Sequence, residues 1–546
     1  MLTQPPLPTP DAVDVLVVGA LTIDHFADGA ETAGGSVLHA ARGLWLDGRS
    51  VGVVTLAGDE PAARTGLRKL AEIAEVAAEP ARQTVAFAHL DRPVGRQLQL
   101  RAPADLLSRG PVAGRPRAVL YAPVADELGP SLGGQQFDGV PSGAILQGWL
   151  RRLAPGEAIR PLPLAELAEP IRQRLARCDL LAASTEDLLA EAPTPAAQLA
   201  ALRATFGPGP LLLLTGGSEG AWLQEPTGAL YRIRPPRIIE GVPDVGAGDA
   251  FAALLLDGLA RGIPPVAAAT DAAGVTAEML AERSTRVVHV VGDVHGMAAE
   301  LGALLRDIGL TDASGSWSGG RDELWLTGDL VDRGPDGIGV LDLLLRLARE
   351  AAAAGGRVAS VLGNHEVLLL AAREMPDAPS GGPGGTMRDD WLYNGGRDSD
   401  LDRLTDEHAD WLRSLPVAAR VAAALIVHAD ASFYTQLPAG VTSAVAQVRD
   451  ILAAPRPDAW DALLAAFSGR RAFAEDPSLA SRVLERFGGR TVIHGHTAVA
   501  SLTGVPPTGV HQAHVYAHGR CVAVDPGLYR GGAAFAHRLP KAADSG

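Results

Sequence analysis

The sequence predicts an α/β protein of two domains, and three observations lead to this expectation. A chain of 546 residues is too long for a single hydrophobic core. A short β-branched run at residues 13–18 ends in glycine, as a buried strand does, and a second such run occurs at residues 286–291. A helical pattern at residues 264–283 lies between them. We therefore expect domains at residues 11–283 and 286–538, each opening with a central strand.

Composition excludes several classes of protein. The chain is 47% hydrophobic and 20% charged, and its formal net charge of -15 argues against a broad surface for nucleic acid or anionic membrane. Its two cysteines, Cys178 and Cys521, are too few for a disulfide framework, which fits a reducing cytoplasm. The first ten residues lack a positively charged leader, and the apolar stretch after them is too short to cross a bilayer. We expect a cytoplasmic protein.

Three polar motifs follow apolar runs in the second half of the chain. They are GDVHG at residues 292–296, GDLVDRG at 328–334 and GNHE at 363–366, and two later histidines also follow strand-like runs. Residues just beyond the carboxyl ends of strands converge on one crevice in an α/β sheet. Carboxylate, imidazole and amide ligands suit two divalent ions, Mn, Fe, Zn or similar, that share a carboxylate. The candidates are Asp293, His295, Asp329, Asp332, Asn364, His365, His428 and His496.

This ordered set resembles the calcineurin-like metallophosphoesterases over residues 286–535, and DRG followed by GNHE resembles their phosphoprotein phosphatase branch. The resemblance implies a β-sandwich flanked by helices and direct attack by a water held between two metals. It implies that Asp293 and His295 bind one metal, that Asp329 bridges, and that Asn364, His428 and His496 bind the other. It further implies that Arg333 holds the phosphate and that His365, oriented by Asp332, protonates the leaving oxygen.

Two positions near these motifs depart from that branch or are less defined. Arg470 is a candidate for its second phosphate-binding arginine, and Asp430 stands where a small residue is usual. The branch includes protein Ser/Thr phosphatases and dinucleoside tetraphosphate hydrolases. We favour hydrolysis of phosphomonoesters, in a phosphorylated small molecule or a phosphoprotein, and keep the dinucleotide alternative open.

A glycine-rich turn at residues 242–251, VPDVGAGDAF, leads into an apolar helical pattern in the first half. Backbone N–H groups at a helix N-terminus form an anion site, and a neighbouring carboxylate can take the proton of a hydroxyl that attacks phosphorus. Gly246, Gly248 and Asp249 are therefore candidates for phosphoryl-transfer chemistry.

The same half resembles the ribokinase-like PfkB kinases over residues 11–280, through GAGD, GALTID, a double glycine, ILQGWLRR and LLLLTGGSEGAWL. The resemblance implies a three-layer α/β/α fold, ATP with Mg, and a sugar or cyclitol substrate. By this pattern Asp249 is the catalytic base, and the remaining residues are Gly246, Ala247, Gly248, Gly217 and Gly220 for the nucleotide, with Asp24, Gly34 and Gly35 for the substrate.

Three departures from the PfkB pattern leave two interpretations open. His39 replaces an asparagine, Ser184–Asp187 (STED) replaces the usual NxxE, and Pro243 displaces the acid that opens the GAGD signature. The first interpretation is a bifunctional enzyme, a kinase fused to a phosphatase. The second is a phosphatase or dinucleoside polyphosphate hydrolase regulated by a kinase-like domain that binds a metabolite.

Overall fold

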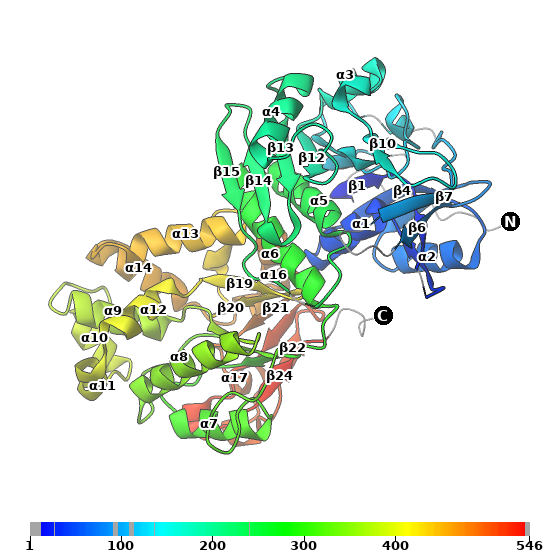
Figure 1. Ribbon diagram of the computed structural model, residues 1–546. Helices are drawn as coiled ribbons and strands as arrows, with labels where there is room; N and C mark the ends of the chain where they lie inside the picture. Colours follow the sequence, from blue (N-terminus) through cyan, green and yellow to red (C-terminus); the bar gives the residue numbers. More distant parts are fainter. Residues whose placement is uncertain are drawn as a thin grey trace. The chain divides into compact units, whose positions relative to one another are not determined.

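The computed structural model describes residues 13–26, 28–90, 97–108, 114–135, 137–239 and 241–540, so the first ten residues discussed above lie outside it. The chain divides into two compact units between Arg283 and Ser284. In Figure 1 the N-terminal unit runs from blue to green and the C-terminal unit from green to red.

A nine-stranded sheet forms the centre of the N-terminal unit. Its strands are parallel except for the last two along the chain, which continue the edge as an antiparallel hairpin. Buried β-branched and leucine residues fill the central strands, as expected for a sheet covered on both faces. The order across the sheet is β15 (Leu230–Ile233), β14 (Ala221–Gln224), β13 (Leu211–Thr215), β12 (Leu180–Ser184), β9 (Ser142–Ile145), β8 (Ala118–Tyr121), β1 (Val15–Val18), β4 (Val51–Ala57) and β5 (Glu75–Pro80).

Helices cover both faces of this sheet and complete the predicted α/β/α arrangement. On one face α1 (Ser36–Leu46), α5 (Ala247–Ala260) and α6 (Pro265–Ala281) pack on one another, and α5 also packs on β8, β9 and β12. On the other face α3 (Glu169–Leu175) and α4 (Pro195–Phe206) share a core with alternate residues of the same strands. The helix predicted at 264–283 is α6.

A second, four-stranded sheet follows the first strand of the N-terminal unit and carries several candidate residues. Its order is β3 (Glu31–Gly34), β2 (Thr22–His25), β6 (Val85–Leu90) and β7 (Gln97–Ala102). The remaining elements of this unit are α2 (Pro61–Ala71), the hairpin β10 (Arg151–Arg152) and β11 (Arg160–Pro161), and the 3-10 turns η1 (Leu132–Gly134), η2 (Leu146–Gly148), η3 (Leu164–Glu166) and η4 (Gly217–Glu219).

Two sheets pack face to face in the C-terminal unit and form the predicted sandwich. One has the order β18 (Arg357–Ser360), β17 (Glu323–Leu326), β16 (Val288–Val291) and β24 (Ala536–Arg538). The other has the order β19 (Ala418–Val421), β20 (Ala424–Val427), β21 (Thr491–His494), β23 (Cys521–Ala523) and β22 (His514–Tyr516). Val290 and Trp325 of the first sheet and Ile426, Ile493 and Val522 of the second lie in one buried cluster between them.

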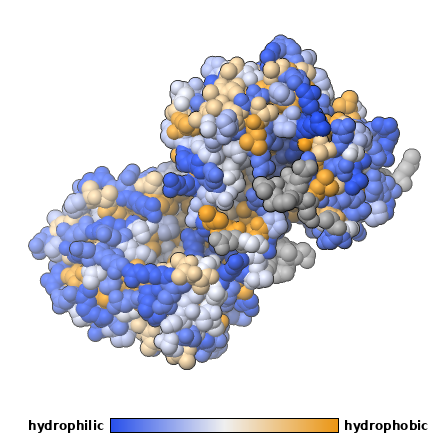
Figure 2. All heavy atoms as spheres, in the orientation of Figure 1, coloured by the Kyte–Doolittle hydropathy of each residue, from blue (hydrophilic) through white to orange (hydrophobic). Residues whose placement is uncertain are grey.

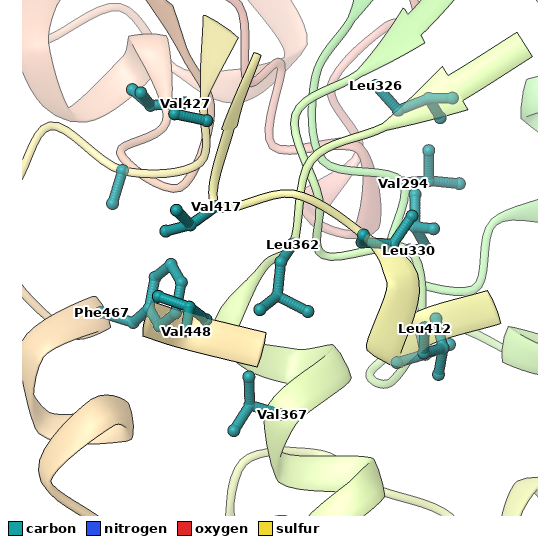
Figure 3. Packing of buried hydrophobic residues seen from close by; sticks show 14 of the residues in the cluster. Val294, Leu326, Leu330, Leu362, Val367, Leu412, Val417, Val427, Val448 and Phe467 are labelled. Atoms are coloured by element: carbon teal, nitrogen blue, oxygen red, sulfur yellow. The ribbon is translucent and has the colours of Figure 1, made fainter. Parts of the chain in front are cut away.

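Helices flank the sandwich and bury a larger apolar cluster. In the view of Figure 3, Leu362 lies between Val448 and Phe467 on one side and Leu330 and Leu412 on the other. The helical elements are α7 (Ala298–Asp307), α8 (Gly337–Ala353), α9 (Asn364–Glu374), α10 (Met387–Tyr393), α11 (Asp398–Arg403), α12 (Asp406–Ser414), η5 (Ser432–Gln436), α13 (Val441–Leu452), α14 (Pro457–Phe467), α15 (Ala472–Glu475), α16 (Pro477–Phe487), α17 (Val499–Thr503), η6 (Pro507–Gly509) and η7 (Leu528–Arg530).

The surface shown in Figure 2 is mostly hydrophilic, with apolar residues in small groups. Among the described residues, no helix combines the length and the apolarity that a membrane crossing requires.

Candidate metal centre and kinase site

Loops that leave the strands of both C-terminal sheets bring the candidate ligands together. Asp293 and His295 follow β16, Asp329 follows β17, and Asn364 begins α9 after β18. From the second sheet, His428 follows β20 and His496 follows β21. Several residues at these bends have left-handed backbone with φ between 47° and 65°, a conformation that costs non-glycine residues about 1–3 kcal/mol each. They are His295, Asp329, Asp332, Arg333 and His496.

Two groups of three buried side chains form at this point and share Asp329. His295, Asp329 and His365 make one group, and Asp329, His428 and His496 make the other. Within each group the possible ligand atoms lie within 4.8 Å of one another. A carboxylate common to two such groups is an arrangement that suits a pair of divalent ions.

Backbone carbonyls fix the tautomers of two of these histidines. His295 Nδ1 lies 3.1 Å from the Val331 carbonyl oxygen, and His428 Nδ1 lies 2.8 Å from that of Thr327. Each Nδ1–H therefore donates outward and leaves the Nε2 lone pair facing the cluster. Arg333 supports this for His295, because its Nη1 lies 2.8 Å from His295 Nε2 and a guanidinium can only donate.

Several buried polar atoms of the cluster have no hydrogen-bond partner among the described residues. They are Asp329 Oδ2, His365 Nε2 and His496 Nε2. Beside them, Asn364 Oδ1 and His496 Nδ1 each lie 3.0 Å from His428 Nε2, and Asp329 Oδ1 lies 3.3 Å from it. Buried polar atoms are nearly always paired, so these atoms indicate a missing ligand. The chemistry of Asp329 Oδ2 and His496 Nε2 fits divalent metal ions. The Nε2 of His365 would face the substrate instead when it carries a proton.

Three buried carboxylates crowd the same place. Burial, together with the charges of Asp525 and Asp329, raises the pKa of Asp293 well above its usual range. Burial and the charge of Asp329 raise the pKa of Asp525 to about 6. This excess of negative charge in a buried place also favours bound cations.

Asp293 lies beside the two three-residue groups and belongs to neither. Its Oδ2 is 4.0 Å from His295 Nε2, while its oxygens accept from the Thr327 hydroxyl at 3.2 Å and from the His496 N–H at 2.9 Å. His365, for which we expected the role of acid, completes the first group in its place.

His365 is held by a buried acid. Its Nδ1 lies 2.7 Å from Asp332 Oδ2, and the indole N–H of Trp391 donates to Asp332 Oδ1 at 2.8 Å. Burial opposes the charged form of His365, but the charges of Asp329 and Asp332 outweigh it and raise its pKa. The Nε2 of His365 faces Asp329 Oδ2 at 3.9 Å. This geometry suits a proton donor at the edge of the cluster.

Four residues of this site were missing from the sequence analysis. The Glu366 carboxylate accepts from the N–H groups of Asp329, Leu330 and Gly363, at 2.7–2.9 Å, and so joins two of the motif loops. The ring of Tyr529 lies 4.7 Å from the Arg333 guanidinium and 4.9 Å from the His295 ring. The others are Trp391 and Asp525. Only Glu366 had a local signal, since an acid three residues after a helix N-cap is a capping pattern.

The structure also places the two less defined positions. Arg470 reaches the cluster, where its guanidinium donates to the His496 carbonyl oxygen. Asp430 is fully buried and accepts from the Thr497 hydroxyl. It therefore lies inside the fold, and nothing places it on the substrate side.

In the N-terminal unit the GAGD turn begins α5 as expected. Gly246 is the N-cap with φ 79°, and a Cβ there would lie 2.0 Å from the ring of His39. The turn therefore requires glycine at this position. Ala247 and Gly248 begin the helix, and Asp249 lies in its first turn. Burial raises the pKa of Asp249 to about 6, although a hydrogen bond with Ser36 works against this.

The expected substrate residues lie together at β2 and β3. A Cβ on Gly34 would lie 2.3 Å from Asp24 Oδ2, and Gly35 has φ 103° close to the Ala20 carbonyl. His89 Nε2 lies 3.6 Å from Asp24 Oδ1.

The two glycines expected near the nucleotide lie at the ends of η4, where Gly217 is the first residue of the turn and Gly220 follows it. A Cβ on Gly217 would lie 3.5 Å from Asp244 Oδ2, so Gly217 is near the GAGD loop. A Cβ on Gly220 would lie 2.3 Å from the Ile233 carbonyl of β15, which gives this glycine a packing role.

The chain matches two known protein families. A calcineurin-like phosphoesterase family model matches residues 286–500, and a pfkB family carbohydrate kinase model matches residues 158–289.

Two curated relatives and one solved structure illustrate the similarity. A symmetrical bis(5'-nucleosyl)-tetraphosphatase of Pectobacterium carotovorum subsp. carotovorum (strain PC1) is 38% identical over 133 residues, which are 24% of this chain and 37% of that protein. Shewanella-like protein phosphatase 2 of Arabidopsis thaliana is 36% identical over 89 residues, 16% of this chain and 22% of that protein. A pyrophosphate-dependent ribokinase-family kinase, solved with a pyrophosphate analog and myo-inositol, has 20% identity and a TM-score of 0.39, covering 49% of this chain and 94% of that one.

This chain thus spans little more than a third of the length of the first of these relatives, at 37%. The two family matches and the two compact units indicate the same pair of domains. The chain contains a pfkB family carbohydrate kinase domain followed by a calcineurin-like metallophosphoesterase domain.

Proposed function

We propose that the C-terminal unit hydrolyses phosphomonoesters with the help of two divalent metal ions. The observation that carries this proposal is the set of buried, unpaired atoms that converge on one point: Asp329 Oδ2, His365 Nε2 and His496 Nε2. A phosphate ester is the substrate class that a two-metal centre beside an arginine and an acidic histidine is suited to bind and cleave.

The residues divide into two sets of ligands that share Asp329. Asp293 and His295 would hold one ion, and the second set is Asn364, His428 and His496. When bound, the two ions would supply positive charge for the phosphate oxygens and lower the pKa of a water that attacks phosphorus. Mn, Fe, Zn and similar ions all accept this donor set.

Arg333 and His365 would act on the substrate itself. Arg333 donates to the same nitrogen of His295 that would face a metal, and one lone pair cannot serve both. With a metal on His295, the guanidinium of Arg333 is released from this bond and can hold two phosphate oxygens. His365 would give its Nε2 proton to the leaving oxygen while Asp332 holds its Nδ1–H.

A second candidate substrate is a dinucleoside polyphosphate, because the relative from Pectobacterium carotovorum is named for cleavage of such compounds. The two candidates differ in the bond that is cleaved, a phosphomonoester in one and a phosphoanhydride in the other. The leaving group of a phosphoanhydride is a stabilised phosphate, which needs less help from an acid than an alkoxide does. Dependence on His365 therefore separates them.

For the N-terminal unit we propose transfer of phosphate from ATP to a sugar or cyclitol. The support is Asp249, a buried carboxylate in the first turn of α5 behind the glycine turn, with Asp24 and the double glycine assembled on β2 and β3. The alternative is a domain that binds a metabolite without turnover and regulates the C-terminal hydrolase.

One substrate screen tests these proposals. The full chain is loaded with Mn²⁺ and assayed with phenyl phosphate, a phosphoserine peptide and diadenosine tetraphosphate, and separately with MgATP and a panel of polyols. We expect release of phosphate from a monoester and ADP formation that depends on a polyol. Cleavage of diadenosine tetraphosphate with no activity on monoesters would favour the second candidate. A chain that never forms ADP in the presence of any polyol would refute the kinase proposal.

A further inference from the structure

Arg151 occupies a fixed place at the carboxyl ends of the parallel strands. It begins β10, three residues after η2, the turn that follows β9. Gly148 of η2 packs tightly on the loop after β8, because a Cβ there would lie 2.4 Å from the Pro123 carbonyl carbon. Gln147 Nε2 lies 3.5 Å from Ser36 Oγ at the start of α1. This edge of an α/β sheet is where ligands bind.

The guanidinium of Arg151 is poorly paired. Its Nη1 donates to the Val124 carbonyl oxygen over a long 3.4 Å, and its central carbon lies 6.0 Å from the centre of the Phe87 ring. Among the described residues it forms no ion pair. Burial lowers its pKa in spite of the carboxylates around it. Arg152, next in the chain, is half exposed and pairs with Glu166.

Four carboxylates from different segments act electrostatically on Arg151: Asp187, Asp249, Glu127 and Asp24. All four also have other polar neighbours. Glu127 accepts from the backbone N–H groups of Ala20, Val124 and Ala125, at 2.8–3.1 Å. Asp187 accepts from the Ser184 hydroxyl at 2.8 Å. Asp249, the expected catalytic base, is hydrogen-bonded to Ser36, and Asp24, an expected substrate residue, accepts from the Thr22 hydroxyl at 3.5 Å. The Phe87 ring near the Arg151 guanidinium belongs to the residue that pairs with Asp24 across β2 and β6. Arg151 therefore has donors to spare on the side of the sheet that carries Asp24, and the charge of Asp249 also acts on it.

We propose that Arg151 is a further catalytic residue of the kinase unit, which holds the phosphoryl group as it passes from nucleotide to polyol. This inference rests on the proposed kinase function. A polyol oxygen bonds to the γ-phosphorus of ATP, the bond from that phosphorus to the β-phosphate oxygen breaks, and ADP leaves. The hydroxyl proton goes to Asp249, and Arg151 contacts the non-bridging oxygens of the transferred group.

The chemistry of a guanidinium suits this role. The departure from the PfkB pattern at Ser184–Asp187 also explains why an additional donor is needed. Its planar fork binds two phosphate oxygens at once, and its charge offsets the charge that spreads over them during transfer. The departure at Ser184–Asp187 replaces an amide and a longer acid with a hydroxyl and an acid that bond to each other. Those two side chains are thus bonded to each other, and Arg151 is a different source of donors for the transferred group.

The test uses the full chain and five proteins: wild type, Arg151→Met, Arg151→Lys, Arg152→Met and Asp249→Asn. The first measurement is ADP formation from MgATP that depends on the polyol which the wild type phosphorylates best. We expect Arg151→Met to lose about 100- to 1,000-fold in kcat, as for other removed phosphoryl or oxyanion donors, with a much smaller change in the polyol KM. Arg152→Met is the matched control and should keep the wild-type rate.

The second measurement is calorimetric binding of ADP with and without aluminium fluoride, a mimic of the phosphoryl group in transit. Aluminium fluoride should tighten ADP binding to wild type and to Arg152→Met, and should leave ADP binding to Arg151→Met unchanged. A loss of both ADP binding and rate in Arg151→Met would instead indicate a structural role and overturn the inference.

The outcomes separate this inference from the kinase proposal. Wild-type kcat in Arg151→Met, with loss of activity in Asp249→Asn, overturns the role of Arg151 and leaves the kinase standing. No ADP formation by wild type with any polyol overturns both. If thermal unfolding shows that Arg151→Met does not fold, Arg151→Lys decides, because it keeps the charge and loses the fork. It should be at least about tenfold slower, and a wild-type rate would refute the inference.

Discussion

Replacement of Asp332 by asparagine should separate the acid step of hydrolysis from phosphate binding. The Asp332 carboxylate is fully buried and accepts from His365 Nδ1–H at 2.7 Å and from Trp391 Nε1–H at 2.8 Å. An asparagine of the same size has one oxygen for two donors and carries no charge. Loss of a hydrogen bond between charged groups costs about 1.5–3 kcal/mol. At 1.36 kcal/mol per pKa unit, the pKa of His365 should fall by about one to two units.

The protonation state of His365 determines whether hydrolysis becomes faster or slower as the pH rises. The acid works only when protonated, and its raised pKa keeps it so until the pH rises past that value. Activity on phenyl phosphate, whose leaving group needs a proton, should therefore fall on the alkaline side of its pH profile, as the pH rises past the pKa of His365. In Asp332→Asn this fall should move to lower pH by about one to two units, with about a 10- to 100-fold loss near neutral pH.

The assay compares two leaving groups over a range of pH at saturating Mn²⁺. With p-nitrophenyl phosphate, whose leaving group is acidic, the loss in Asp332→Asn should be several times smaller. Asp342→Asn is the control, since Asp342 also pairs with a histidine, His408 Nε2 at 3.0 Å, and belongs to neither ligand group. Equal losses for both substrates, with no movement of the alkaline limb, would refute the acid role of His365.

Three further predictions concern the core and the two sites. Leu362→Ala empties a fully buried position before the GNHE motif and should lower the free energy of unfolding by about 2–5 kcal/mol in a denaturant titration; a change below about 1 kcal/mol would contradict the packing. Glu366→Gln leaves some of the three backbone N–H groups without an acceptor, so Mn²⁺ affinity measured by titration should fall about 10- to 100-fold, and an unchanged affinity would count against its role. If Asp249 is the proposed base of the kinase unit, it must be ionised, and burial raises its pKa to about 6. The rate of ADP formation should then rise about tenfold per pH unit below 6 and level off above, and a rate independent of pH there would exclude this role.

The positions of the metal motifs could be predicted because each depends on local pattern. An apolar run that ends in glycine and a carboxylate indicates a strand and the loop at its carboxyl end, and the sheet then brings these loops together. Asp329 in both three-residue groups follows from that rule. The α5 turn was predictable for the same reason, since glycine before an apolar helical pattern marks a helix start.

The residues that support the site could not be predicted in this way. Trp391 reaches Asp332 from α10, 59 residues further along the chain, and no spacing in the sequence signals such a contact. Asp525 and Tyr529 enter the site through the fold of the last segment, after the strand β23. Arg151 was part of a quoted motif, but its lack of partners is visible only once the loops around it are in place. Tertiary packing, and not local propensity, sets these contacts.

The metal content of the Mn²⁺-loaded chain is the most direct test of the two-metal centre. Mass spectrometry of the metal in wild type, His428→Ala and Asp329→Asn should be read beside hydrolysis of phenyl phosphate by the same samples. We expect about two ions in wild type, about one in His428→Ala, and close to none in Asp329→Asn, whose hydrolysis should be lost because both groups share that carboxylate. Wild-type hydrolysis by Asp329→Asn, or by a chain stripped of metal, would contradict this expectation.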